Sequence, residues 1–261
     1  IESAHKTLPA MTQTAFLHVQ GDKVSVKDVQ RMLSVYQSSS PSYVLMSSLD
    51  KCIRELSTKG QKDANEMLIT LKKFHNRVKN FKVLKVLDRS IIGKNSVYDF
   101  DISKITVSVK GLNINGVQLA DKLRNDFKIE PEMVCSDYIL LITTVCDTDE
   151  GFARLVNALQ IIDSECSAKE LNYNNLLLSQ PRIALNPCDC SGKSGDFYRL
   201  KNSINKISLE YVWAYPPGIP IVAKGEVITQ EIVDTIFMQI KNGINVYSTK
   251  GRVPKEILCC E

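Results

Sequence analysis

The most informative stretch of the sequence lies near its start and reads Ser3-Ala4-His5-Lys6-Thr7-Leu8-Pro9-Ala10-Met11-Thr12-Gln13-Thr14. A lysine directly follows a histidine, a serine stands three residues before that lysine, and a threonine–glutamine pair stands six and seven residues after it. A lysine amine attacks an aldehyde only after losing its proton, and burial beside other cationic groups favours that loss. A bare histidine–lysine pair is common on protein surfaces, but the extended pattern is far rarer. The extended pattern makes Lys6 a candidate functional residue.

The whole stretch resembles the pyridoxal 5'-phosphate (PLP) attachment site of the Orn/Lys/Arg decarboxylase family, which are fold-type I PLP-dependent decarboxylases. In that family the lysine carries the cofactor as a Schiff base, and the serine and histidine of Ser-x-His-Lys lie against the cofactor phosphate. The resemblance therefore implies that Lys6 and His5 are catalytic and that Ser3, with both of them, binds PLP. A hydroxyl and an imidazole N–H are suitable donors to phosphate oxygens.

A second stretch, residues 37–50, resembles the same family. There, a Thr/Ser-Ser-Pro turn introduces a helix and approaches the cofactor phosphate of the other subunit. Ser38 and Ser39 match that turn, so the resemblance implies further PLP contacts and at least a homodimer. Serine hydroxyls and the free N–H groups at a helix start together favour an anion. The alternative is that these serines only cap the helix, and the sequence leaves both possibilities open.

The bulk composition is that of an ordinary globular protein, with 261 residues of which 44% are hydrophobic and 24% charged. A net charge of +4, spread along the chain, is too weak to indicate a nucleic-acid partner. No apolar run is long enough to cross a membrane, so we expect no membrane partner and a cytoplasmic location.

The eight cysteines include two close pairs, Cys188 with Cys190 and Cys259 with Cys260, that could be half-sites for zinc. Their spacing differs from the usual C-x-x-C knuckle, and no histidine lies near them in the sequence. We therefore expect free thiols and no bound metal.

Hydrophobic periodicity and turn residues predict the order of helices and strands. Helices are predicted over residues 28–37, from Pro41 with the preceding serine as its cap, from Asp63 onward, over 120–127, over 152–159 after an Asp147-Thr148 cap, and over 229–242. Strands are predicted over 105–109, over 138–145 with burial on both faces, and over 207–214, while 186–202 is predicted to be a loop. This alternation is typical of an α/β fold.

The family resemblance continues at residues 101–105, 129–132 and 215–220, and so covers nearly the whole chain. It implies that residues 1–82 end a PLP-binding large domain and that residues 83–261 form a small C-terminal α/β domain. Three prolines and a glycine make 215–220 a rigid turn, to which we assign a structural role.

In the family a long cofactor-binding segment precedes the lysine. It supplies an aspartate for the pyridine nitrogen and a ring that stacks on the cofactor. No candidate for either precedes Lys6 in this sequence. We therefore expect this chain to be the C-terminal part of such an enzyme and not to decarboxylate amino acids alone.

The resemblance implies a decarboxylase for arginine, lysine or ornithine that releases CO₂ and a precursor for polyamine biosynthesis. Two alternatives remain open at this point. The same fold supports aminotransferases and lyases, because the reaction depends on how the substrate is oriented. The chain alone could also be an inactive module for dimer contacts. The sequence does not single out an acidic residue that recognises the basic substrate.

Overall fold

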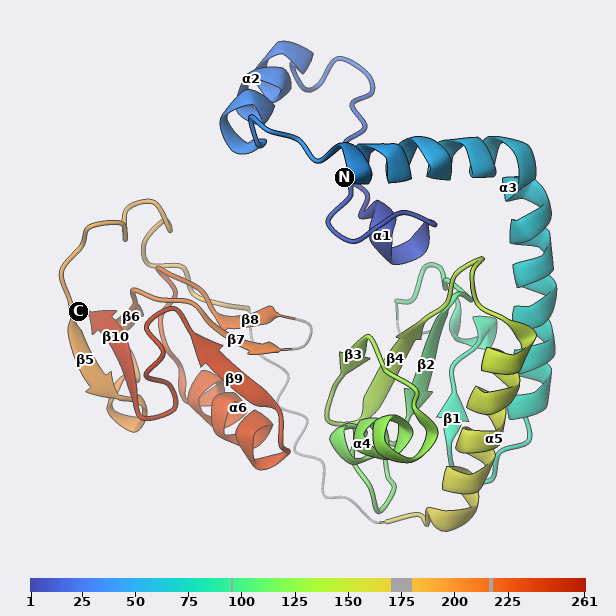
Figure 1. Cartoon of the computed structure of the whole chain (residues 1–261). Helices are drawn as coiled ribbons and strands as arrows, with labels where there is room; N and C mark the ends of the chain where they lie inside the picture. Colours follow the sequence, from blue (N-terminus) through green and yellow to red (C-terminus); the bar gives the residue numbers. More distant parts are fainter. Residues whose placement is uncertain (95, 170–179, 216–217) are drawn as a thin grey trace. The chain divides into compact units, whose positions relative to one another are not determined.

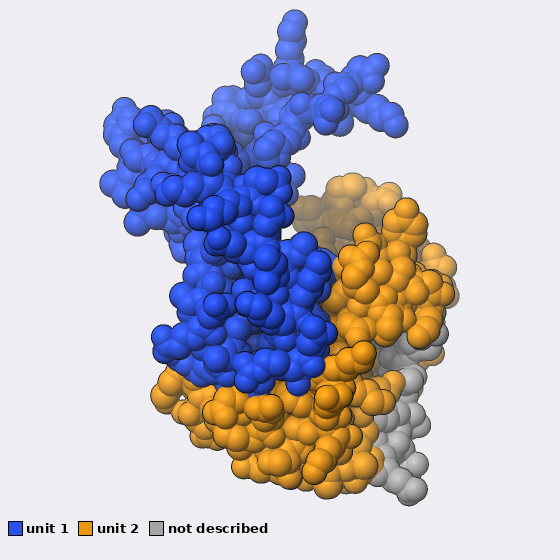
Figure 2. Space-filling view, turned by 90° about the vertical axis from the view of Figure 1, so that its right-hand side faces the viewer, with its two compact units in different colours: residues 1–77, 101–103, 142–156 blue, residues 78–100, 104–141, 157–261 orange. Residues whose placement is uncertain are grey.

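The computed structural model of the chain forms two compact units (Figures 1 and 2). The structure describes residues 1–94, 96–169, 180–215 and 218–261. The first unit comprises residues 1–77, 101–103 and 142–156, and the second comprises 78–100, 104–141 and 157–261. The domain boundary after residue 82 stays a prediction. Pro216 and Pro217 of the proline-rich turn lie outside the described residues.

The first unit begins with three helices, α1 (Ala4–Thr7), α2 (Val26–Tyr36) and α3 (Tyr43–Val78). The helix predicted over 28–37 is confirmed as α2, which begins two residues earlier because Ser25 caps it by accepting from the backbone N–H of Asp28 at 3.3 Å. Within the described part of the chain, none of the α2 residues is buried.

Helix α3 is one continuous helix of 36 residues and unites the two helices predicted from Pro41 and from Asp63. The predicted cap at Ser40 is wrong, because the helix begins later. The Ser42 hydroxyl accepts from the backbone N–H of Leu45 at 3.4 Å and so takes the capping role. Figure 1 shows α3 changing direction along its length. Its middle contains two hydroxyls that donate to the Arg54 carbonyl, an arrangement that bends helices.

The last part of the first unit packs the start of α5 (Asp149–Glu165) against α3. The predicted capping segment is confirmed, since Thr148 Oγ1 accepts from the backbone N–H of Gly151 at 3.1 Å. Phe74 of α3 and Phe152 of α5 meet edge to face with ring centroids 5.9 Å apart, and both are buried. This contact buries apolar surface in a unit that is otherwise rich in exposed helix.

A four-stranded sheet follows, with strand order β1-β2-β4-β3 (Figure 1). Its strands are β1 (Lys85–Val86), β2 (Lys104–Ser108), β3 (Met133–Val134) and β4 (Tyr138–Ile142), with the short 3-10 helix η1 (Arg89–Ile91) after β1. Burial on both faces of 138–145 is wrong, because only Ile139 and Leu141 of β4 are buried. The strand also stops at Ile142, where Asp147 accepts from the backbone N–H of Thr144 and closes a turn.

Helix α4 (Gly116–Phe127) confirms the helix predicted near residue 120. It begins with a capping box, in which Asn115 and Gln118 each accept from the other's backbone N–H at 2.9 Å. It ends at Lys128, whose φ of 57° is left-handed. These local signals fix both ends of the helix.

The C-terminal part contains two three-stranded sheets, ordered β5-β10-β6 and β8-β7-β9, and helix α6 (Gln230–Lys241), which packs on β8 and β9. The strands are β5 (Asp196–Arg199), β6 (Ile207–Ser208), β7 (Val212–Tyr215), β8 (Ile219–Val222), β9 (Asn245–Ser248) and β10 (Glu256–Cys260). Their shared core includes Val212, Ile236 and Ile257.

Two sequence predictions fail in this part. The predicted loop 186–202 contains β5 and the 3-10 helix η2 (Leu200–Asn202), because β5 pairs with β10 over a long sequence distance. The single strand predicted over 207–214 is two strands, β6 and β7, which belong to different sheets. Glu210 lies between them, fully buried, and accepts from the backbone N–H groups of Lys250 and Leu258.

Candidate active site

The lysine-bearing stretch forms a closed loop that contains α1. Glu2 and Phe16 exchange two backbone hydrogen bonds of 2.8 Å and bring the two ends of the loop together. Ala4 and Thr14 are buried inside, at 0% and 3% exposure, whereas Lys6 is exposed. The loop therefore has its own small interior and presents the lysine on its surface.

The His5 ring is fixed within this loop. Its Nδ1 atom lies 2.8 Å from the backbone carbonyl oxygen of Thr14. A carbonyl oxygen only accepts hydrogen bonds, so Nδ1 carries the proton in this contact. The neutral ring then has an acceptor at Nε2, and the ring donates from Nε2 only when it is doubly protonated. The predicted contact from His5 to a phosphate therefore requires the imidazolium form.

Ser3 and Lys6 lie on the same helical turn as His5. Ser3 is the N-cap residue of α1, and its backbone carbonyl accepts from the Lys6 N–H at 3.1 Å. Among the described contacts of α1, the Ser3 side chain makes no capping hydrogen bond. Residues three apart on a helix are neighbours on its surface. The structure thus brings together three of the five predicted site residues.

The other two predicted residues, Ser38 and Ser39, lie in the exposed segment between α2 and α3. The Ser38 hydroxyl donates to the Ser40 carbonyl and accepts from the Ser40 N–H, both at 3.2 Å, and so closes a local turn. Because Ser42 caps α3, the capping alternative for Ser38 and Ser39 is wrong. Their proposed contact with a phosphate stays a prediction.

Two supporting residues escaped sequence analysis. The backbone N–H of Met11 donates to Ser48 Oγ on α3 at 3.1 Å, and Thr14 Oγ1 donates to the Met11 carbonyl at 2.6 Å. The lysine loop is therefore anchored to α3 and braced internally. Ser48 lies within the second stretch that resembles the family, but neither its partner nor the role of Thr14 has a sequence signal.

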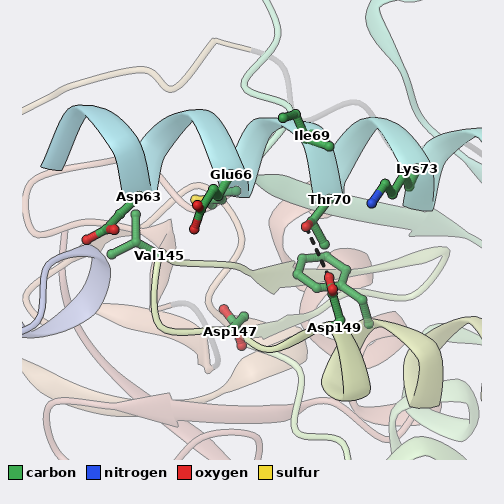
Figure 3. Close-up of a pocket in the computed structure, with 10 residues that line it drawn as sticks. Asp63, Glu66, Ile69, Thr70, Lys73, Val145, Asp147 and Asp149 are labelled. Atoms are coloured by element: carbon green, nitrogen blue, oxygen red, sulfur yellow. Dashed lines mark hydrogen bonds between the residues drawn. The ribbon is translucent and has the colours of Figure 1, made fainter. Parts of the chain in front are cut away.

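A separate cavity of about 340 Å³ lies between α3 and the start of α5 (Figure 3). Figure 3 shows Glu66 and Asp147 on opposite sides of this space, with Thr70 donating to Asp149 at 3.2 Å. The lining includes the four carboxylates of Asp63, Glu66, Asp147 and Asp149. Such a cavity disfavours a phosphate, and among the described residues that line it there is none of the five predicted ones.

The cysteines are all free thiols, as the sequence predicts. Burial, with smaller contributions from Glu210 and Cys260, raises the pKa of Cys259 to about 12, so this thiol stays protonated near neutral pH. Within the described residues, no group of three or more His, Cys, Asp or Glu side chains could hold a metal ion. No helix in the same part of the chain is long and apolar enough to cross a membrane.

The chain has an α/β fold, and its lysine loop carries the motif that resembles a PLP attachment site. The sequence profile of the Orn/Lys/Arg decarboxylase major domain matches residues 1–124. An arginine decarboxylase from Bacillus subtilis (strain 168) is 33% identical over 247 residues, and one from Bacillus anthracis is 31% identical over 247 residues. Each match covers 94% of this chain and 50% of the relative. These matches support the Orn/Lys/Arg decarboxylase family, whose model covers residues 1–124 of the 261.

Solved structures agree on the fold. The Francisella novicida lysine decarboxylase LdcF matches with a TM-score of 0.79 at 18% identity, over 99% of this chain and 48% of that chain. The E. coli constitutive lysine decarboxylase matches with a TM-score of 0.73 at 13% identity, over 99% and 49%. The predicted α/β class is therefore confirmed. The chain spans about half the length of the curated relatives it matches.

Proposed function

We propose that this chain forms the lysine-bearing part of a PLP-dependent, fold-type I decarboxylase that acts on a basic amino acid. The observation that carries this proposal is the single helical turn that holds Ser3, His5 and Lys6. Residues 1–82 would end the PLP-binding large domain, and residues 83–261 would form the small C-terminal domain. Homo-oligomeric assembly and a cytoplasmic location belong to the same proposal.

The side chains on this turn fit PLP by their donor chemistry. Lys6 offers an amine to the cofactor aldehyde, while Ser3 offers a hydroxyl, and His5 in its imidazolium form an Nε2–H, to the cofactor phosphate. Neither the Ser3 hydroxyl in its capping position nor the His5 Nε2 atom is used by the described contacts of the loop. When bound, PLP supplies an electron sink for the charge left at the substrate α-carbon as CO₂ departs.

The residues of the chain supply position and proton handling. Lys6 Nζ would hold the cofactor covalently and, once the substrate amine has displaced it, would be placed to return a proton to the substrate α-carbon. The His5 ring cannot rotate freely, because the Thr14 carbonyl holds Nδ1 at 2.8 Å. Its Nε2 atom therefore keeps one direction, and a catalytic group is effective only when it is held in a fixed orientation.

The substrate class follows from the family and from the names of the relatives, which are arginine decarboxylases among the curated proteins and lysine decarboxylases among the solved structures. We propose arginine, lysine or ornithine as substrate, with CO₂ and agmatine or a diamine as products. Incubating the full-length protein with PLP and each amino acid, followed by product analysis, tests this proposal. Formation of a keto acid without CO₂ would indicate an aminotransferase instead.

Replacing Ser38 and Ser39 together by alanine is expected to weaken PLP binding by about 1–3 kcal/mol, the order for lost hydrogen bonds to a charged group. The matched control is Ser42→Ala, which removes the cap of α3 and costs about 1 kcal/mol of helix stability but should leave PLP affinity unchanged. Fluorescence titration with PLP measures both. Equal PLP affinity in the double variant and the wild type would contradict a phosphate-binding role.

A further inference from the structure

A chain of hydrogen bonds leads from α3 to the catalytic turn. Ser48 accepts from the Met11 N–H at 3.1 Å, the Met11 carbonyl accepts from Thr14 Oγ1 at 2.6 Å, and the Thr14 carbonyl contacts His5 Nδ1 at 2.8 Å. Thr14 is 3% exposed although its side chain is polar. Most buried hydroxyls in proteins are hydrogen-bonded, and this one donates to the Met11 carbonyl within the turn that ends at Thr14.

The backbone of this turn is also unusual. Gln13 has a φ of 79°, which is in the left-handed region that non-glycine residues seldom adopt. This conformation turns the chain between Met11 and Thr14, and the backbone N–H of Thr14 donates to the Met11 carbonyl at 3.3 Å. The turn therefore sets the direction in which the Thr14 carbonyl points.

We propose that Thr14 is a positioning residue, whose braced backbone carbonyl holds the His5 ring with the proton on Nδ1 and leaves Nε2 for a bound group. The Thr14 hydroxyl stabilises the turn through its hydrogen bond to the Met11 carbonyl, and the Thr14 carbonyl accepts from Nδ1 of the His5 ring. The consequence for catalysis rests on the proposed function, because it requires that His5 faces the cofactor. The tautomer itself does not depend on that function.

The test is the ring tautomer of His5, read from ¹⁵N chemical shifts of histidine-labelled protein at a pH where the rings are neutral. The sequence has three histidines, and His5→Gln identifies the signal of interest. In the wild type we expect the Nδ1–H form to dominate at His5. A dominant Nε2–H form would overturn the proposal without any variant.

Variants of the turn separate positioning from general stability. Thr14→Val removes the hydroxyl but keeps the shape, and we expect it to shift the tautomer ratio toward Nε2–H by roughly fivefold, the equivalent of one ordinary hydrogen bond. Thr14→Ser keeps the hydroxyl and should restore the wild-type ratio. An unchanged ratio in Thr14→Val, with the fold intact by circular dichroism, contradicts the proposal.

A parallel titration with PLP keeps this inference distinct from the proposed function. A dominant Nδ1–H form together with an absence of covalent PLP binding would support the positioning by Thr14 and contradict the decarboxylase proposal. Covalent PLP at Lys6 together with a mixture of His5 tautomers would support the decarboxylase proposal and contradict the positioning by Thr14.

Discussion

In the full-length protein, replacing Lys6 by alanine is expected to abolish covalent binding of PLP and to lower decarboxylation by roughly 10²–10⁴-fold, the range that one positioned proton-transfer group contributes. Lys6 is exposed on α1 and is the lysine that the motif matches. In the wild type, borohydride reduction followed by peptide mapping should place a pyridoxyl group on Lys6. In Lys6→Ala that label and the visible absorption band of bound PLP should both disappear.

Two further variants sharpen this experiment. Lys6→Arg keeps the positive charge but offers a guanidinium that stays protonated, so it should fail as completely as alanine. Lys23→Ala removes another exposed lysine of the first unit and should leave PLP binding unchanged. A pyridoxyl label on any lysine other than Lys6 would show that the motif has been assigned wrongly.

Sequence reasoning succeeded where the structural signal is local. The capping residue Thr148 and the bounds of α6, to within one residue at each end, were predicted because such signals act within a few residues of the helix end. The strand β5 was missed because its pairing with β10 joins residues about sixty apart and its own residues are mostly exposed. The break between β6 and β7 was missed because the buried Glu210 accepts from the backbone N–H groups of Lys250 and of Leu258 in β10, both about forty or more residues away.

The same distinction applies to the candidate site. Ser3, His5 and Lys6 were identified because their side chains carry recognisable chemistry. Thr14 was not, because it contacts His5 through a backbone carbonyl that every residue possesses. Ser48 was not, because a serine inside a helix gives no indication of a partner 37 residues away. Residues that support a site from long range leave little trace in a single sequence.

Asp163 on α5 is the clearest example of such long-range support in the second unit. It is 7% exposed, and its carboxylate accepts from the backbone N–H groups of Lys82, Val83 and Leu84 at 2.8–2.9 Å. Burial alone would raise the pKa of Asp163, but the three backbone donors outweigh it and hold the pKa below its usual value. The charged carboxylate therefore fastens the segment before β1 to α5.

Asp163→Ala is expected to lower the free energy of unfolding of the protein by about 3 kcal/mol, because hydrogen bonds to a charged acceptor are lost and the N–H of buried Leu84 loses its partner. The matched control is Glu165→Ala, on the same helix as Asp163, which removes an exposed ion pair with Lys122 of α4 and should cost at most about 1 kcal/mol. Urea denaturation at neutral pH measures both, and equal losses would contradict a special role for Asp163.

The pH dependence gives an independent check on the same carboxylate. Because the pKa of Asp163 is depressed in the folded protein, its stabilisation is fully present above the unfolded-state value of about 4 and is lost as the pH falls through the folded-state value. The difference in unfolding free energy between wild type and Asp163→Asn should therefore be constant above about pH 5 and should shrink at lower pH. A difference that stays constant throughout acid titration would show that the charge of Asp163 does not hold the segment, and that the oxygen atoms alone suffice.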